Sequence, residues 1–136
     1  MGACWKVLGS LTLEGIEITQ KGLQMTLSDK RQHFTLMLSE LLWWARANDL
    51  HVALDYVKRS EQEQAAMVEA GASQTMNSKH LDGLAMDLLL YASGVYVTSA
   101  EPYRPLGDYW KSLDPANVWG GDWETLVDAG HFEYAG

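Results

Sequence analysis

The feature that most constrains the fold of this 136-residue chain is a carboxylate inside an apolar run. Asp87 interrupts residues 86–90, which are otherwise typical of a buried strand. A buried carboxylate without a partner is costly, so the fold must bring a suitable group to it. His80 precedes it, and the small residues Gly83 and Ala85 between the two allow the backbone to pass close to a ligand site. A bound metal ion would supply the partner.

A second histidine near the end of the sequence completes a potential metal site. His131 follows Asp128 by three residues, far downstream of His80 and Asp87. Two imidazoles and one carboxylate suit zinc, and three protein ligands leave one position for water, as a catalytic zinc requires. Asp128 is close enough to act on that water without binding the metal, which is the place of a general base. We therefore predict that His80, Asp87 and His131 bind one zinc ion and that Asp128 is catalytic.

The spacing of these residues resembles that of a known enzyme family. The motif is Ser78-x-His80-x-x-Gly83-x-Ala85-x-Asp87, followed downstream by Asp128-x-x-His131-Phe132-Glu133. It resembles the zinc peptidases of bacterial cell-wall peptides, a family that includes D-Ala-D-Ala carboxypeptidases, D-Ala-D-Ala dipeptidases and phage L-alanyl-D-glutamate endopeptidases. Residues 59–64 resemble the Arg-then-Gln segment of this family, and residues 27–34 resemble the first helix of its phage endolysin branch.

The resemblance implies both an architecture and a set of roles. It implies an α+β fold with a small, predominantly antiparallel sheet covered by helices and one zinc ion in an open cleft. Asp128 would take a proton from water and pass it to the leaving amine. Arg59 would polarise the scissile carbonyl and stabilise the oxyanion, and Ser78 and Gln64 would bind substrate. The catalytic domain would span residues 27–136, with residues 1–26 as an unassigned N-terminal segment.

Hydrophobic periodicity predicts two early helices. The first covers residues 28–48 with Ser28 as N-cap. Its apolar positions recur at three- and four-residue spacing and are Phe34, Met37, Leu38, Leu41, Leu42 and Ala45. Trp43 and Trp44 widen this face, and we interpret them as core residues rather than substrate contacts. The second helix follows a capping box formed by Ser60 and Glu63 and stops at Gly71.

The rest of the chain is predicted to be rich in strands. Alternating and apolar runs predict strands at residues 51–57, 84–91, 95–99 and 131–134, the middle two joined by a tight turn. We expect loops at residues 72–79, which would deliver Ser78 and His80, and at residues 118–123. Short helical pieces are predicted at residues 108–113 and 123–127, and an irregular segment with one strand or helical turn at residues 12–25. This order favours an α+β domain.

The composition fits a single enzyme domain. Hydrophobic residues make up 47% of the chain and charged residues 21%, which is ordinary for a globular protein and excludes a disordered one. The net charge is −8, and the ten lysines and arginines are scattered. This distribution argues against nucleic acid as a partner, because phosphate binding needs clustered cations.

The N-terminal sequence lacks the pattern of an export signal or membrane anchor. No charged segment precedes a long apolar stretch, and the apolar runs are too short to cross a bilayer. The one cysteine, Cys4, is predicted to be a reduced thiol. We therefore expect a protein without stable membrane association, made in the host cytoplasm. The resemblance to endolysins implies later release to the periplasm and cell wall, with a holin giving access.

The function implied by the resemblance is that of a phage or prophage endolysin, a monomer that cleaves the L-Ala-D-Glu bond of peptidoglycan stem peptides. One alternative is a D-Ala-D-Ala carboxypeptidase or dipeptidase. Another is a non-catalytic, zinc-stabilised binding module, which would have no reason to keep Asp128. For Glu133, a contact to a zinc ligand and a place in the substrate floor both stay open. His33 and His51 are not expected to be ligands, because an open zinc site already has its three.

Overall fold

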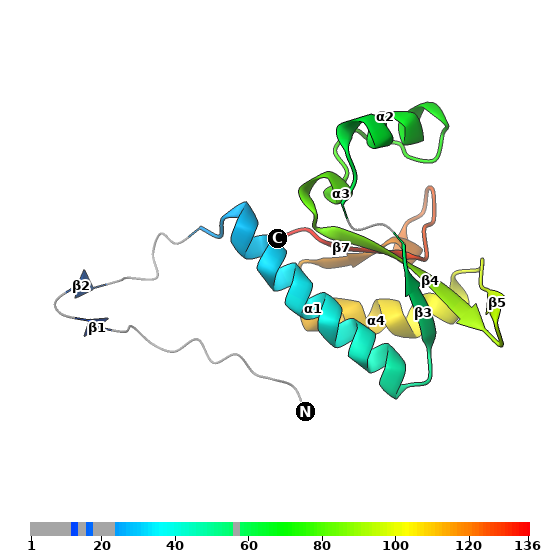
Figure 1. Ribbon diagram of the computed structural model, residues 1–136, viewed down its shortest axis with the longest axis horizontal. Coiled ribbons are helices and arrows are strands. Elements are labelled where there is room, and N and C mark those ends of the chain that lie inside the picture. The colour runs from blue at the N-terminus through cyan, green and yellow to red at the C-terminus, as the bar shows by residue number, and fades with distance from the viewer. Residues whose placement is uncertain (1–11, 14–15, 18–23, 56–57) are drawn as a thin grey trace.

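The computed structural model describes residues 12–13, 16–17, 24–55 and 58–136 (Figure 1). Its helices and strands, in chain order, are β1 (Thr12–Leu13), β2 (Ile16–Glu17), α1 (Leu27–Ala47), β3 (His51–Leu54), α2 (Glu61–Glu69), α3 (Lys79–Asp82), β4 (Ala85–Ala92), β5 (Val95–Tyr96), the 3-10 turn η1 (Glu101–Tyr103), α4 (Arg104–Leu113), β6 (Asn117–Trp119), the 3-10 turn η2 (Gly120–Asp122) and β7 (His131–Tyr134). The predicted α+β class is confirmed.

The main sheet is antiparallel throughout and has the order β3-β4-β7-β6, with β5 paired to the end of β4. β1 and β2 form a separate two-stranded ladder. β4 and β5 form the predicted hairpin, and its turn contains Ser93 and Gly94, both with positive φ. Such angles match the twist of two-residue hairpin turns.

Strand alternation separates a core face from a polar face of the sheet. Helices α1 and α4 pack on the core face, while α2, α3 and the loop after η2 stand on the other (Figure 1). The core-facing side chains of β4 and β7 are Met86, Leu88, Leu90, Phe132 and Tyr134. Asp87 and His131 are directly opposed across the β4–β7 ladder, and alternation points both away from this core. The register therefore brings two predicted ligands together.

Helix α1 confirms the predicted apolar face but begins differently. Phe34, Met37, Leu41 and Ala45 are buried in it. The N-cap is Thr26 rather than the predicted Ser28: Asp29 N–H donates to Thr26 Oγ1 (3.1 Å), and Asp29 Oδ2 accepts from Thr26 N–H (2.9 Å). This reciprocal pair provides acceptors for two backbone N–H groups at the start of the helix, those of Thr26 and Asp29. Ser28 accepts from neither of them.

The tryptophan pair of α1 divides between core and solvent. Trp44 stacks on Tyr109 of α4, with ring centroids 4.7 Å apart. Trp43 is 69% exposed, so its predicted place in the core is wrong. Successive helical residues point about 100° apart, and the packed face of α1 is too narrow to cover both rings.

Several other predicted boundaries need correction. His80 lies on the short helix α3 rather than in the preceding loop. Strand β6 occupies part of the predicted 118–123 loop, because its backbone pairs with β7. Residues 123–127 form no helix and contain a bend at residues 124–126, α4 is longer than predicted, and β3 and β5 are shorter. α2 and its capping box are confirmed. The predicted strand at residues 56–57, parts of the 12–25 prediction and Cys4 lie outside the described residues.

Among the helices that the structure describes, none has the length and apolar character needed to span a membrane.

Candidate metal centre and catalytic pocket

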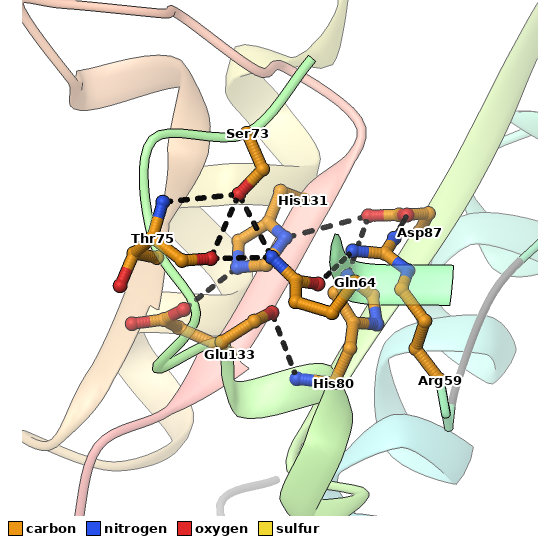
Figure 2. Close-up of polar contacts among 9 residues, drawn as sticks. Arg59, Gln64, Ser73, Thr75, His80, Asp87, His131 and Glu133 are labelled. Atoms are coloured by element: carbon orange, nitrogen blue, oxygen red, sulfur yellow. Dashed lines mark hydrogen bonds and ion pairs between the residues drawn. The ribbon is translucent and has the colours of Figure 1, made fainter. Parts of the chain in front are cut away.

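Three side chains that suit a metal ion converge on the polar face of the sheet. His80 comes from α3, Asp87 from β4 and His131 from β7, and one ligand atom from each lies within 4.8 Å of the others. Asp87 Oδ1 is 3.2 Å from His80 Nε2 and 3.4 Å from His131 Nδ1 (Figure 2). We call these three residues the ligand cluster. Their two imidazoles and one carboxylate fit zinc chemically, since they leave a coordination position open.

The backbone around α3 places His80 toward the strand residue Asp87. Ser78 is the N-cap of α3, and its Oγ accepts a hydrogen bond from His80 N–H (3.3 Å). Gly83 ends the helix with φ +71°, a left-handed conformation that glycine adopts without strain. The His80 carbonyl accepts from Arg59 N–H (3.0 Å), which joins α3 to the start of α2. The predicted substrate residue Ser78 therefore also shapes the helix that carries a ligand.

The charges in the ligand cluster are strongly coupled. Burial alone would raise the pKa of Asp87, but hydrogen bonds from His131 and His80 lower it to about 2. Burial alone would lower the pKa of His131, but the carboxylates of Asp87 and Glu133 raise it to about 9. The cluster thus holds a positive charge on His131 when no metal is bound, and a metal ion has to displace that proton.

Glu133 lies against the second nitrogen of His131. Its Oε2 is 2.7 Å from His131 Nε2, while His131 Nδ1 faces Asp87 (Figure 2). Glu133 and His131 are two residues apart on β7, so both point to the polar face. A carboxylate that accepts the other ring N–H of a histidine ligand fixes its orientation and tautomer. Of the two roles left open for Glu133, the structure therefore favours a contact to a predicted zinc ligand over a place in the substrate floor.

Metal binding to the metal-free protein should depend strongly on pH. Because the pKa of folded His131 is about 9, each metal ion bound below that pH should release a proton. We expect the apparent zinc affinity to fall by about tenfold per pH unit below pH 9, as one released proton requires. Isothermal titration in buffers of different ionisation enthalpy measures this release. An affinity that is flat between pH 6.5 and 8.5 would contradict the expectation.

The same pKa shift predicts how the stability of the metal-free protein depends on pH. The pKa of His131 is raised above its ordinary 6.5, so its contribution to stability is fully present below pH 6.5 and is lost as pH rises through 9. Asp87 stays ionised in this range, since its pKa is about 2. Thermal unfolding of the metal-free protein should therefore occur at lower temperature at pH 9.5 than at pH 6.5.

Arg59 and Gln64 form a buried polar network beside the ligand cluster. Arg59 is 6% exposed and Gln64 is fully buried. Arg59 Nη1 donates to Gln64 Oε1 (2.8 Å), and Arg59 Nη2 lies 3.6 Å from Asp87 Oδ2. Gln64 Nε2 donates to Ser73 Oγ (2.9 Å) and to the Thr75 carbonyl (2.6 Å; Figure 2). Gln64 thus connects the guanidinium of Arg59 to the loop after α2.

The segment that carries Asp128 is held by two residues that the sequence pattern did not single out. The Gly120 carbonyl accepts from Asp128 N–H (3.0 Å), and Trp119 Nε1 donates to the Ala129 carbonyl (2.7 Å). A Cβ at position 120 would overlap the Asp128 carbonyl and lie 2.9 Å from His131 Cβ. Gly120 therefore permits the close approach that sets Asp128 and His131 in place.

Asp128 lies at the solvent-exposed rim of the site. It contacts the same pocket as the ligand cluster. Partial desolvation by the pocket walls, together with the negative charge of Asp87, raises the pKa of Asp128. A raised pKa makes a carboxylate a better proton acceptor and donor near neutral pH, as acid–base catalysis requires.

All but one of the predicted site residues line one pocket of about 500 Å³. Those that line it are Arg59, Ser78, His80, Asp87, Asp128 and His131, together with Glu133. Gln64 does not line it and reaches it only through Arg59. A smaller cavity of about 220 Å³ shares Asp87, Val127 and Asp128 with this pocket and extends to Asp55 and Tyr96.

The other two histidines lie apart from the pocket. His33 Nε2 is 2.9 Å from Asp114 Oδ2, and His51 is exposed beside Asp49.

Comparison with known proteins agrees with this geometry. A family model described as D-alanyl-D-alanine carboxypeptidase matches residues 71–134, which include the ligand cluster and Asp128. An L-alanyl-D-glutamate peptidase of Listeria phage A118 is 36% identical over 97 residues. The chain is therefore similar to cell-wall peptidases over the segment that carries the ligand cluster. The aligned region is 70% of this chain but 34% of the phage peptidase, so the chain spans about a third of that relative.

Solved structures share the peptidase fold. The L-Ala D-Glu endopeptidase ChiX of Serratia marcescens matches with a TM-score of 0.65 and 27% identity, over 76% of this chain and 78% of ChiX. The D,D-pentapeptidase VanY from a VanB-type vancomycin resistance cassette, solved with Zn(II), matches with a TM-score of 0.50 and 20% identity, over 76% and 71% of the two chains. At that identity, the VanY match shows the fold alone.

Proposed function

We propose that this protein is a zinc metallopeptidase that cleaves the L-Ala-D-Glu bond of peptidoglycan stem peptides. The observation that carries the proposal is the ligand cluster opening into a pocket that Asp128 and Arg59 also line. The specificity is supported by two relatives, the Listeria phage peptidase and ChiX, whose names state this bond. The second cavity shares Asp87, Val127 and Asp128 with the first and offers further space for a substrate that extends beyond the cleaved bond, as an endopeptidase needs.

His80, Asp87 and His131 would hold one zinc ion. When bound, zinc lowers the pKa of a water molecule and polarises a carbonyl group. Asp128 receives the proton of the attacking water and transfers it to the leaving amine, a task that suits a carboxylate of raised pKa at the pocket rim. Glu133 holds His131 in one orientation throughout.

Arg59 would stabilise the negative charge that develops on the carbonyl oxygen. Its guanidinium is buried at the pocket wall and is oriented by Gln64 and Asp87, so it needs little rearrangement during reaction. Ser78 lines the pocket and is available to the substrate there. We assign Gln64 an indirect part in substrate binding, because its amide is engaged with Arg59, Ser73 and Thr75.

The biological setting belongs to the same proposal. We propose a phage or prophage endolysin, with residues 27–136 as a monomeric catalytic domain that reaches the cell wall from the host cytoplasm with the help of a holin. The relative from Listeria phage A118 supports a phage origin.

A D-Ala-D-Ala carboxypeptidase is the second candidate. The description of the matching family model favours it, since that description names this activity. Both candidates use the same metal and base, and they differ in the bond that is cut.

Digestion of purified peptidoglycan separates the two candidates. We expect the zinc-loaded protein to release peptides with new D-Glu amino termini and to leave L-Ala on the muramyl glycan, as end-group labelling with mass spectrometry would detect. Asp128→Ala protein serves as the control for contaminating hydrolases. Release of free D-Ala without new D-Glu amino termini would contradict the endopeptidase assignment and favour the second candidate.

A further inference from the structure

Leu126 has a backbone conformation that is unfavourable for its side chain. Its φ is +48°, in the left-handed region where the Cβ of an L-residue is crowded. Among the residues that the structure describes, Asp49 and Ser93 are the other non-glycine residues with positive φ. Both are short polar residues in turns, the kind that tolerates this conformation better than leucine.

Residues on either side of Leu126 donate hydrogen bonds to the same carbonyl group. The Gly120 carbonyl accepts from Trp123 N–H (3.3 Å) and from Asp128 N–H (3.0 Å). The Trp123 ring lies against the ring of His131, with centroids 4.8 Å apart. Trp123, before Leu126, therefore packs on the predicted ligand His131, and Asp128, after Leu126, is the predicted base. The two hydrogen bonds to Gly120 constrain the backbone between them and hold Leu126 in its conformation.

The side chain of Leu126 lines the pocket and is not part of the hydrophobic core. Leu126 is 46% exposed and Val127 is 55% exposed, and both line the pocket that contains the ligand cluster. Glycine or asparagine would adopt the same backbone at lower cost, and neither would expose an aliphatic group. Strain together with apolar exposure at a reaction site is expected where the side chain has a contact to make.

We propose that Leu126 contacts the alanine that precedes the cleaved bond and selects its methyl group. This inference rests on the proposed function, in which an alanine supplies the carbonyl of that bond. Leu126 lines the same pocket as Asp128 and the ligand cluster, so a substrate methyl group beside the reacting carbonyl would lie in a pocket that this side chain also lines. A residue without the methyl group leaves this apolar rim uncovered and is bound less well.

The test compares two synthetic stem peptides that differ only in alanine or glycine before the cleaved bond. The zinc-loaded wild type is expected to prefer alanine by at least about tenfold in kcat/KM, the effect of one methyl group in an apolar contact. Leu126→Gly and Leu126→Asn should reduce this preference below about threefold, mainly through KM. Both variants should unfold at or above the wild-type temperature, since they relieve the strained backbone.

Ser93→Gly is the matched control, because it relieves a positive φ in a turn outside the pocket and should keep the full preference. Leu126→Asn tests whether a loosened loop explains the glycine variant. A preference for alanine that survives in Leu126→Asn, or that is missing in the wild type, overturns the inference. If the wild type cuts D-Ala-D-Ala instead, the proposed function fails, and the same comparison at the alanine before that bond decides the role of Leu126 separately. A wild type that cuts neither bond overturns both.

Discussion

Replacing His131 by alanine is expected to remove both the metal and the activity. Two protein ligands would remain, too few to hold zinc in competition with protons and buffer. Bound zinc should fall from one ion per chain to a trace by elemental analysis, and peptide hydrolysis should fall to background. His80→Ala should behave in the same way, since His80 also lies within contact distance of Asp87 in the ligand cluster.

His33→Ala is the matched control for these variants, because His33 is a histidine paired with Asp114 away from the pocket. It should keep zinc and activity. Loss of His131 also leaves the carboxylates of Asp87 and Glu133 without their shared partner, so circular dichroism has to show that the variant is folded. A folded His131→Ala protein with stoichiometric zinc and normal activity would remove His131 from the ligand set.

Replacing Asp128 by alanine is expected to separate metal binding from catalysis. The three ligands remain in place, so zinc content and thermal stability should stay near those of the wild type. The rate of hydrolysis should fall by about a hundredfold or more, the range expected when a positioned acid–base group is lost. Most of the loss should appear in kcat rather than KM, because the proton moves only in the transition state.

Glu124→Ala is the control for Asp128→Ala, since it removes an exposed carboxylate from the same loop. Its activity should stay within about twofold of the wild type, as is usual for a surface substitution. If Asp128→Ala protein loses zinc instead, Asp128 is a ligand and the division of roles proposed above is wrong.

The sequence brought the three residues of the ligand cluster into one predicted site through their combination, because each signal is weak alone and only the spacing of the set resembles a known family. Asp87 stands out as a charge in an apolar strand, and His131 is the first residue of the short strand β7. Their meeting follows from antiparallel pairing of β4 and β7, the arrangement expected when both strands cover one core. The 3.6-residue period of apolar residues predicted the core face of α1.

Other features depend on contacts between distant segments, which local patterns do not report. Thr26 and Ser28 are both good capping residues, and only the backbone entering α1 decides between them. The importance of Gly120 arises from its contact with Asp128 and His131. In the sequence, Gly120 is only the first of two glycines after a tryptophan, and nothing local indicates that contact. β6 has three residues, too few for a period of two to be recognised.

Because Asp87 and His131 are paired directly across the sheet, metal binding would favour the native register of β4 and β7 over a shifted one. A slip of one residue between β4 and β7 would turn one of the two side chains toward the helices and oppose it to an apolar residue. Such a misaligned sheet would lack a complete set of ligands, so zinc would bind it weakly and would draw the population toward the native register. The ion would then select the correctly folded chain before it takes part in any reaction.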